Sequence, residues 1–349
     1  MSIKMRVLQL MAGGEKGGAE KFFDRLVVGL HKKNIHQAVI VRPHPDRVAF
    51  LRKNGLTPIV APFGSIFDFQ TSHILRRTIA TFNPDVVLTW MSRASKFCPK
   101  GPYVSVARLG GYYNLKYYQK ADHLVGNTQD LCDYFTQQGW PLEFSHYLPN
   151  FVDAPSDSIA KDREALATPK EAKIILSLGR LHPNKGFDIL IPALAKIPGA
   201  YLWLGGEGEE HKNLERLASK YQVTERVRFL GWCKDVSALY KAADVYVCPS
   251  RIEPLGNVVI EAWAHQKPVV AAESAGPKSL ITHRENGLLV PIEDIDQLAA
   301  AIQEVLHHKT LRKKISQAGY QSYLNSFTEE KIIAQYINFF KYIQGLKRL

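Results

Sequence analysis

The chain alternates short, continuous apolar runs with stretches of helical periodicity, and this alternation limits its fold more than any other feature. In the first half, the apolar runs occupy residues 5–11, 37–41, 57–62, 85–90, 103–107 and 123–127. Continuous apolar runs between helices are typical of parallel strands that are buried on both faces of a sheet. The sequence therefore predicts an α/β fold, in which helices cover both faces of a parallel sheet.

The alternation stops once and then restarts, which indicates two domains. Residues 149–172 are polar, contain proline and show no periodicity, as expected of a linker. Six further apolar runs follow, at residues 173–179, 201–206, 226–231, 244–249, 268–272 and 287–291. We predict two doubly wound, Rossmann-like domains, at residues 1–168 and 169–327, with the ligand site in a cleft between them. The remaining C-terminal segment carries one apolar stripe at helical spacing, so we expect its last helix to pack on the body of the protein.

Cysteine content and charge limit the compartment and the partners. The four cysteines form no C-x-x-C pair and no zinc spacing, which favours reduced thiols in the cytoplasm. Residues 1–150 carry 19 Lys and Arg against 10 Asp and Glu, so the excess positive charge lies in the first half. Such a surface attracts an anionic membrane or a phosphorylated substrate, unless it is only a solvated surface. No nucleic-acid-binding signature accompanies it.

Glycine-rich turns follow two of the predicted strands, but neither has the dinucleotide-binding spacing. In GGEKGGAE (13–20) and in LGGEGEE (204–210), the G-x-G-x-x-G pattern fails. Arg42 stands where an NAD-binding protein would have an acid for the ribose. A dehydrogenase is therefore disfavoured. Gly17 and Gly18 open a helix, where bare backbone can approach an anion or a sugar, or can simply turn the chain.

Two cations follow the first strand of the second half, in GRLHPNKG (179–186). Arg180 and Lys185 flank a turn, and together they suit a diphosphate, because arginine offers a fork and lysine a point charge. Solvated loop cations are the alternative. The Walker spacing is absent.

The stretch SRIEPLGNVVIE (250–261) holds two glutamates on either side of a predicted helix start. Glu253 precedes the helix and Glu261 lies more than a turn inside it, so they do not form a carboxylate dyad. The first amides of the helix form a ready anion site, and the carboxylates suit hydroxyl groups. Phosphate together with hydroxyls describes a nucleotide sugar. A surface loop acid and an exposed helical glutamate are the alternative interpretations.

These motifs, in this order, resemble the retaining GT-B glycosyltransferases of glycosyltransferase family 4 over nearly the whole chain. The strongest segment is PSRIEPLGNVVIEAWAHQKPVVAAESAGP (249–277), which matches the E-x7-E motif. The resemblance implies that Arg180 and Lys185 bind the donor diphosphate, that Glu253 holds the transferred sugar and that Glu261 accepts from the ribose. It also implies further donor-binding positions, at Gly17, Gly18, Gly206, Glu207, Trp232, Cys233, Leu255, Gly256 and Asn257.

The same resemblance implies no cofactor and no metal, retention of configuration, and a last helix, near 328–349, that returns to the N-terminal domain. The sequence departs from the family at two places. Arg93 lies where many relatives carry a histidine, and Ser279 lies near the place of a common glutamate. Both departures leave the sugar open, and the donor is expected to be a UDP- or GDP-sugar, with an ADP-sugar possible.

Residues 108–128 resemble lipopolysaccharide-core members of the family. The segment combines tyrosines with basic residues, and it suits an acceptor or a headgroup layer, with ordinary helix packing as the alternative. Acceptor-side positions are expected at Arg93, Arg108, Tyr112 and Lys116.

The sequence thus predicts a cytoplasmic, membrane-peripheral hexosyltransferase acting on a Kdo- and lipid A-linked core acceptor. Another glycolipid, a capsule or exopolysaccharide acceptor, a sugar-nucleotide hydrolase or epimerase, and a non-catalytic basic scaffold at the membrane remain as alternatives.

Overall fold

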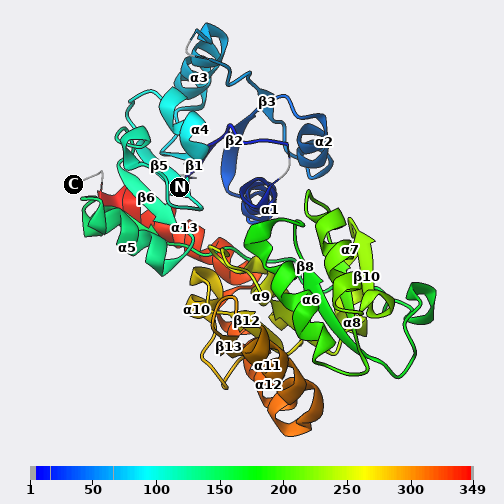
Figure 1. The fold of residues 1–349 in the computed structure, drawn as a ribbon. Helices are drawn as coiled ribbons and strands as arrows, with labels where there is room; N and C mark the ends of the chain where they lie inside the picture. Colours follow the sequence, from blue (N-terminus) through cyan, green and yellow to red (C-terminus); the bar gives the residue numbers. More distant parts are fainter. Residues whose placement is uncertain (1–4, 16, 66, 347–349) are drawn as a thin grey trace. The chain divides into compact units, whose positions relative to one another are not determined.

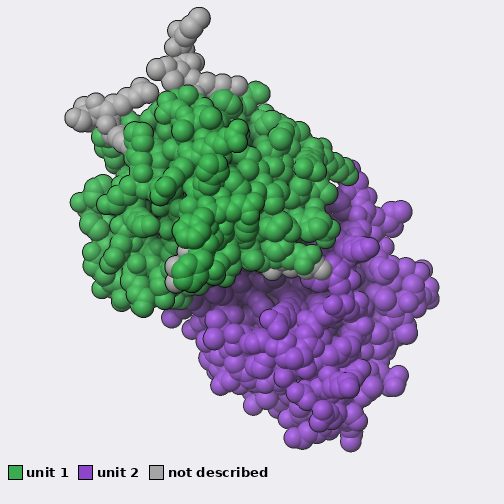
Figure 2. Space-filling view, turned by 90° about the horizontal axis from the view of Figure 1, so that it is seen from above, with its two compact units in different colours: residues 1–150, 329–349 green, residues 151–328 purple. Residues whose placement is uncertain are grey.

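The computed structural model describes residues 5–15, 17–65 and 67–346. These residues form two compact units, which Figure 2 draws in different colours. Unit 1 contains residues 1–150 and 329–349, and unit 2 contains residues 151–328. Among the described residues, no helix is both long enough and apolar enough to cross a membrane.

Unit 1 is built on a seven-stranded parallel sheet with the order β3-β2-β1-β4-β5-β6-β7. Its strands are β1 (Arg6–Met11), β2 (His36–Val41), β3 (Ile59–Val60), β4 (Val86–Trp90), β5 (Val104–Leu109), β6 (His123–Gly126) and β7 (Ser145–Tyr147). Its helices are α1 (Gly18–Lys32), α2 (Pro45–Lys53), α3 (Phe69–Phe82), α4 (Met91–Phe97), α5 (Gln129–Gln137) and α13 (Glu329–Leu346), with 3-10 turns η1 (Leu115–Tyr117) and η2 (Leu142–Phe144). The strand order changes direction between β1 and β4 (Figure 1).

Unit 2 repeats this plan with a six-stranded parallel sheet in the order β10-β9-β8-β11-β12-β13. Its strands are β8 (Lys173–Leu178), β9 (Ala200–Gly205), β10 (Val227–Gly231), β11 (Val245–Cys248), β12 (Val269–Ala272) and β13 (Leu288–Val290). Its helices are α6 (Phe187–Ala195), α7 (His211–Lys220), α8 (Val236–Ala242), α9 (Asn257–Ala264), α10 (Ala275–Leu280), α11 (Ile295–His307) and α12 (Lys309–Ser326), with turns η3 (Glu164–Leu166), η4 (Pro183–Lys185) and η5 (Thr224–Arg226). The order changes direction between β8 and β11.

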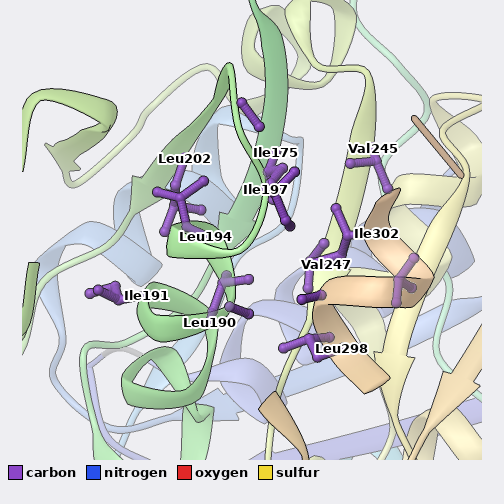
Figure 3. Close-up of a cluster of buried hydrophobic side chains, with 14 of the residues drawn as sticks. Ile175, Leu190, Ile191, Leu194, Ile197, Leu202, Val245, Val247, Leu298 and Ile302 are labelled. Atoms are coloured by element: carbon purple, nitrogen blue, oxygen red, sulfur yellow. The ribbon is translucent and has the colours of Figure 1, made fainter. Parts of the chain in front are cut away.

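The unit 2 sheet is buried on both faces, as its continuous apolar runs predict. Ile175 and Val247 belong to a core cluster with side chains of α6 and α11, which Figure 3 shows meeting on one face. Ile174 and Tyr246, the neighbours in sequence on the same strands, belong to a second cluster with α9. This alternation follows from the period of two along a strand. The predicted fold, two doubly wound α/β domains, is confirmed.

The boundary between the units lies earlier than residues 168 and 169, where the sequence suggested it. Unit 2 begins at Phe151. The polar segment lies against unit 2 because its backbone and side chains find partners there. Arg163 donates to the carbonyl of Ala242, and the indole of Trp203 donates to the Thr168 hydroxyl at 3.0 Å. Lack of periodicity marked the segment correctly as irregular, but it could not show which sheet supplies its hydrogen bonds.

The last helix, α13, packs against the unit 1 sheet through one apolar stripe. Its buried side chains are Ile332, Ile333, Tyr336, Phe339, Phe340 and Ile343. Ile333 lies over Gly29 of α1, where an added Cβ would approach it to 2.6 Å. Phe339 packs on the ring of His146, whose pKa burial lowers to about 4, so this contact is made by a neutral imidazole at physiological pH.

A buried arginine joins α13 to the strands of unit 1. Arg108 on β5 is only 3% exposed, and its Nε donates to the Tyr336 hydroxyl at 3.0 Å. Its Nη2 donates to Asn150, and its guanidinium lies 4.6 and 4.7 Å from the ring centroids of Phe22 and Trp90. The placement of Arg108 in an acceptor-binding surface patch is therefore wrong. Tyr118, from the same expected patch, is also buried, at 1% exposed.

We predict that Tyr336→Phe lowers the free energy of unfolding by about 1–3 kcal/mol, because it leaves a buried guanidinium donor without its acceptor. Urea unfolding measures this loss. Tyr342→Phe is the matched control, since Tyr342 lies on the same helix with 55% of its surface exposed. Equal losses in both variants would mean that the Arg108 contact contributes nothing.

Candidate functional site

The predicted donor-site residues of unit 2 follow the carboxyl ends of four neighbouring strands. Arg180 follows β8, Gly206 follows β9, Trp232 follows β10 and Glu253 follows β11. Because the strands are parallel, these turns lie on the same edge of the sheet. The change of direction between β8 and β11 is where ligands bind in such folds.

Backbone hydrogen bonds join three of these turns into one surface. Gly179 donates to Gly205 at 2.9 Å, Leu181 donates to Glu207 at 2.9 Å, and Gly206 donates to Gly231 at 2.8 Å. The strand pairing thus continues past the strand ends. The peptide groups of the turns are fixed before any ligand binds.

Gly206 allows this close approach of the turns. Its φ is +136°, and an added Cβ would lie 1.8 Å from the carbonyl oxygen of Gly179. No side chain fits there without moving the backbone.

Lys185 and Glu253 form the ion pair at the centre of the site. Lys185 Nζ lies 2.5 Å from Glu253 Oε2, and Gly256 N donates to Glu253 Oε1 at 3.3 Å. The Glu253 side chain is 11% exposed. Both carboxylate oxygens therefore have donors, so the orientation of Glu253 is set by unit 2 itself. The sequence placed the two residues in separate motifs, and the structure brings them into contact.

Arg180 lies at the surface and has an acidic partner that the sequence did not indicate. Its Nη2 lies 3.1 Å from Glu209, and its side chain is 69% exposed. His182 Nε2 lies 3.6 Å from the same carboxylate. An exposed ion pair of this kind contributes little to stability. The Arg180 guanidinium can therefore exchange Glu209 for a phosphate at small cost.

Arg251 connects the two principal loops, and sequence reasoning did not single it out. Its guanidinium makes two 2.7 Å hydrogen bonds to Asp188 and one of 2.6 Å to Glu293. A further hydrogen bond reaches the carbonyl of Pro183. The hydrogen bonds to Asp188 raise the pKa of Arg251 above its usual range. An arginine inside an acid-flanked motif is a visible signal, but partners 63 and 42 positions away are not.

Helix α9 begins between Glu253 and Glu261, as the sequence predicted. Gly256 caps the helix in the left-handed region, with φ +79°, and Leu255 before it is buried. Glu253 lies outside the helix and Glu261 lies in its second turn. Burial is the largest effect on the pKa of Tyr246, which it raises. The charges of Glu261 and Glu253 raise this pKa further. Both carboxylates therefore lie near the end of β11.

Trp232 and Cys233 follow β10 with different exposure. Trp232 is 69% exposed. The Cys233 thiol lies 3.4 Å from the carbonyl oxygen of Gly231, and burial raises its pKa, which disfavours the reactive thiolate. Backbone contacts to a base remain the expected role of this pair.

In unit 1, the glycine turn before α1 is held by two buried charged residues. Glu20 accepts from Gly14 N at 2.9 Å, and its carboxylate occupies the place that a Cβ on Gly17 would need. Arg47, 3% exposed, donates to the carbonyls of Gly14 and Glu15 and forms a 3.1 Å ion pair with Asp24. Burial raises the pKa of Asp24 to about 6. The turn is therefore fixed by side chains beneath it, and at Gly18 nothing would meet an added Cβ.

The acceptor-side residues expected in unit 1 do not form one patch. Arg93 lies on α4 and donates to the carbonyl of Phe63 at 3.0 Å. Tyr112 is exposed and donates to Asp130. The ammonium of Lys116 lies 5.1 Å from the ring centroid of Tyr117. With Arg108 buried, the expected residues are divided between the core, helix α4 and surface loops.

Two Rossmann-like domains are the architecture of the GT-B class, and the glycine turns, cations and fixed carboxylate at the switch point of unit 2 suit a glycosyltransferase site. Among the described residues, no group of three or more His, Cys, Asp or Glu side chains could hold a metal ion. The expected independence of metal remains a prediction.

Known proteins identify the family. A model of the family "Glycosyl transferases group 1" matches residues 158–322. The lipopolysaccharide core biosynthesis glycosyltransferases LpsE and LpsD of Rhizobium meliloti are 36% and 35% identical to this chain. The alignments cover 93% and 96% of this chain and 96% and 98% of those proteins. The crystal structure of HepE from Anabaena, in complex with UDP and glucose, has a TM-score of 0.82 at 23% identity and covers 97% of this chain and 99% of that one. The protein belongs to the group 1 glycosyl transferases.

We predict that Gly206→Ala destabilises the protein at least twice as much as Gly199→Ala. Both glycines have positive φ, so each alanine suffers left-handed strain of about 1–2 kcal/mol. An added Cβ on Gly199 meets nothing within 4 Å, whereas on Gly206 it overlaps a carbonyl and adds about 1–3 kcal/mol. Urea unfolding compares the two, and equal losses would show that the joined turns separate freely.

Proposed function

We propose that the protein transfers a hexose from a nucleotide diphosphate sugar to an acceptor of the lipopolysaccharide core, with retention of configuration and without a metal ion. The observation that carries the proposal is the Lys185–Glu253 pair at the switch point of unit 2. The names of LpsE and LpsD support the acceptor class, and the ligands of HepE support a UDP-sugar donor. A GDP- or ADP-sugar is the alternative donor.

The ion pair suits a site that holds a sugar next to a diphosphate. A carboxylate near a diphosphate would be repelled, and Lys185 offsets this repulsion because it contacts Glu253 directly. Glu253 can then accept from sugar hydroxyls. Lys185 and Arg180 are the cations that can approach the phosphates, and they would stabilise the negative charge that grows on the leaving diphosphate.

The transfer can proceed on one face of the sugar. The bond between the anomeric carbon and the diphosphate oxygen breaks, and the acceptor oxygen bonds to the anomeric carbon from the same side. The acceptor hydroxyl passes its proton to the departing phosphate oxygen. In this scheme Glu253 orients the sugar through hydrogen bonds and forms no covalent bond to it. Glu261 would hold the ribose, and the turn at Trp232 and Cys233 would contact the base.

We predict that Glu253→Gln reduces the transfer rate by at least about 100-fold, the scale of losing one group that acts on the transition state. UDP should still raise the melting temperature of the variant, because the phosphate contacts of Arg180 and Lys185 remain. Transfer from UDP-glucose, UDP-N-acetylglucosamine, GDP-mannose and ADP-glucose to deacylated core oligosaccharide measures the rate and selects the donor.

Glu225→Gln is the matched control, since Glu225 is exposed on η5 in the same unit. Wild-type rates in Glu253→Gln would remove this residue from the reaction. Stabilisation of the wild-type protein by NAD(P) alone, or by no nucleotide, would overturn the proposed transferase and favour a scaffold.

The proposed reaction takes place at an anionic membrane surface, to which the basic first half of the chain is drawn. We predict that co-sedimentation with phosphatidylglycerol vesicles weakens steeply between 50 and 500 mM salt, concentrations chosen because exposed charges are screened over about 10 Å at 0.1 M. Phosphatidylcholine vesicles are the control. Binding that is equal on both lipids, or unchanged by salt, would contradict electrostatic attachment.

A further inference from the structure

A cavity of about 690 Å³ lies wholly within unit 1, between α3 and α4. Its walls come from the loop after β3, from α3, from α4 and from the segment before β6. The lining cations are Arg76, Arg93, Lys96 and Lys120, and the lining hydroxyls include Ser65, Ser72 and Ser92. This volume is within the range of small-molecule sites, which is about 300–1,000 Å³.

The charge of this cavity is one-sided. Among the described residues that line it, four carry positive charge and none is acidic. Like charges brought together in this way repel one another, so the arrangement lowers stability unless an anion is present.

Three of the four cations contact neutral groups, and no described carboxylate lines the cavity. Arg93 donates to the carbonyl of Phe63 at 3.0 Å, and Lys120 donates to the carbonyl of Lys96 at 3.1 Å. The Lys96 ammonium lies 4.2 Å from the ring centroid of Tyr117. Elsewhere in the same unit, buried Arg47 has the carboxylate of Asp24. Asp68 lies between the lining residues Ser65 and Ser72 in the sequence. Its carboxylate accepts from the backbone amides of Gly64 and Thr71.

A buried hydroxyl lies beside the cavity. The Tyr118 side chain is 1% exposed, and its hydroxyl lacks a hydrogen-bond partner of good geometry among the described residues. Burial raises its pKa and the neighbouring Ser92, which lines the cavity, lowers it. A buried hydroxyl beside a cavity-lining serine can donate to an oxygen atom of a bound anion.

We propose that this cavity binds the anionic substituent, a phosphate or a carboxylate, of the saccharide that accepts the sugar. The inference rests on the proposed function, because it assigns the cavity to the acceptor of that reaction. Arg93 was expected on the acceptor side, and Lys120 and Tyr118 lie in the tyrosine-rich basic segment 108–128, whereas Arg76 and Lys96 enter this site only through the structure. The ligand is bound by its charge and oxygen atoms, whether the saccharide is free or linked to lipid.

The test measures binding of deacylated, phosphorylated core oligosaccharide by calorimetry. We expect Arg76→Gln/Lys96→Gln to bind it about tenfold or more weakly, since each charge-assisted hydrogen bond contributes more than a neutral one. The matched control is Arg77→Gln/Lys53→Gln, which removes the same charge from exposed positions of the same unit that do not line the cavity. This control should bind the oligosaccharide within about twofold of wild type, because charges outside the cavity attract it only through solvent, where salt screens them.

Three comparisons make the outcome decisive. Removal of the phosphates and reduction of the carboxylates of the oligosaccharide should abolish the difference between the two double variants. Phosphatidylglycerol vesicles without saccharide should bind both double variants equally, and a loss confined to the cavity variant would assign the cavity to lipid headgroups and overturn the inference. UDP should stabilise both variants as it does wild type. If UDP stabilises all proteins but both variants bind the oligosaccharide equally, the inference fails while the proposed function stands.

Discussion

Parallel strand pairing is the constraint on which the site depends. It brings the carboxyl ends of β8, β9, β10 and β11 to one edge of unit 2, so turns from distant parts of the sequence become neighbours. Glycines are then required where one turn approaches the next, as the backbone contact of Gly206 with Gly179 shows. The cations and the carboxylate follow these turns. The sheet therefore determines where charge can be placed, and the turn residues determine which charge is placed there.

On this edge of the sheet, the Lys185–Glu253 ion pair places a positive and a negative charge next to each other. A site for a nucleotide sugar needs cations for the diphosphate and acceptors for the sugar hydroxyls within a short distance. Placing Lys185 against Glu253 at 2.5 Å, with Gly256 N on the other carboxylate oxygen, keeps both charges in place without a ligand. Arg251 then holds the loops that carry the pair, through two carboxylates. The orientation of both side chains is thus set within unit 2, which reduces the entropy cost of binding a ligand there.

The fold and the positions of the turns in the candidate site were predictable because their signals are local. The apolar runs predicted the strands, and the Pro-Leu-Gly turn before Asn257 predicted the start of α9. Pairing between motifs was not predictable, since Lys185 and Glu253 are 68 positions apart. The polar segment at 151–168 was assigned to the wrong unit for the same reason, because its partners Ala242 and Trp203 lie far along the chain. Sequence periodicity shows which face of a strand or helix is buried, but it does not show which residues pack against that face.

Charge shows this limit most clearly. The basic excess of residues 1–150 suggested an anionic partner, but the sequence cannot separate structural arginines from binding ones. Arg47 and Arg108 are each 3% exposed, and they hold a glycine turn and a C-terminal helix. Arg76 and Lys96 are exposed and line a cavity without acids among its described residues. A guanidinium with buried partners stabilises the fold whether or not a ligand binds. Cations that contact carbonyls and rings, as Arg93 and Lys96 do, keep their charge available for an anion.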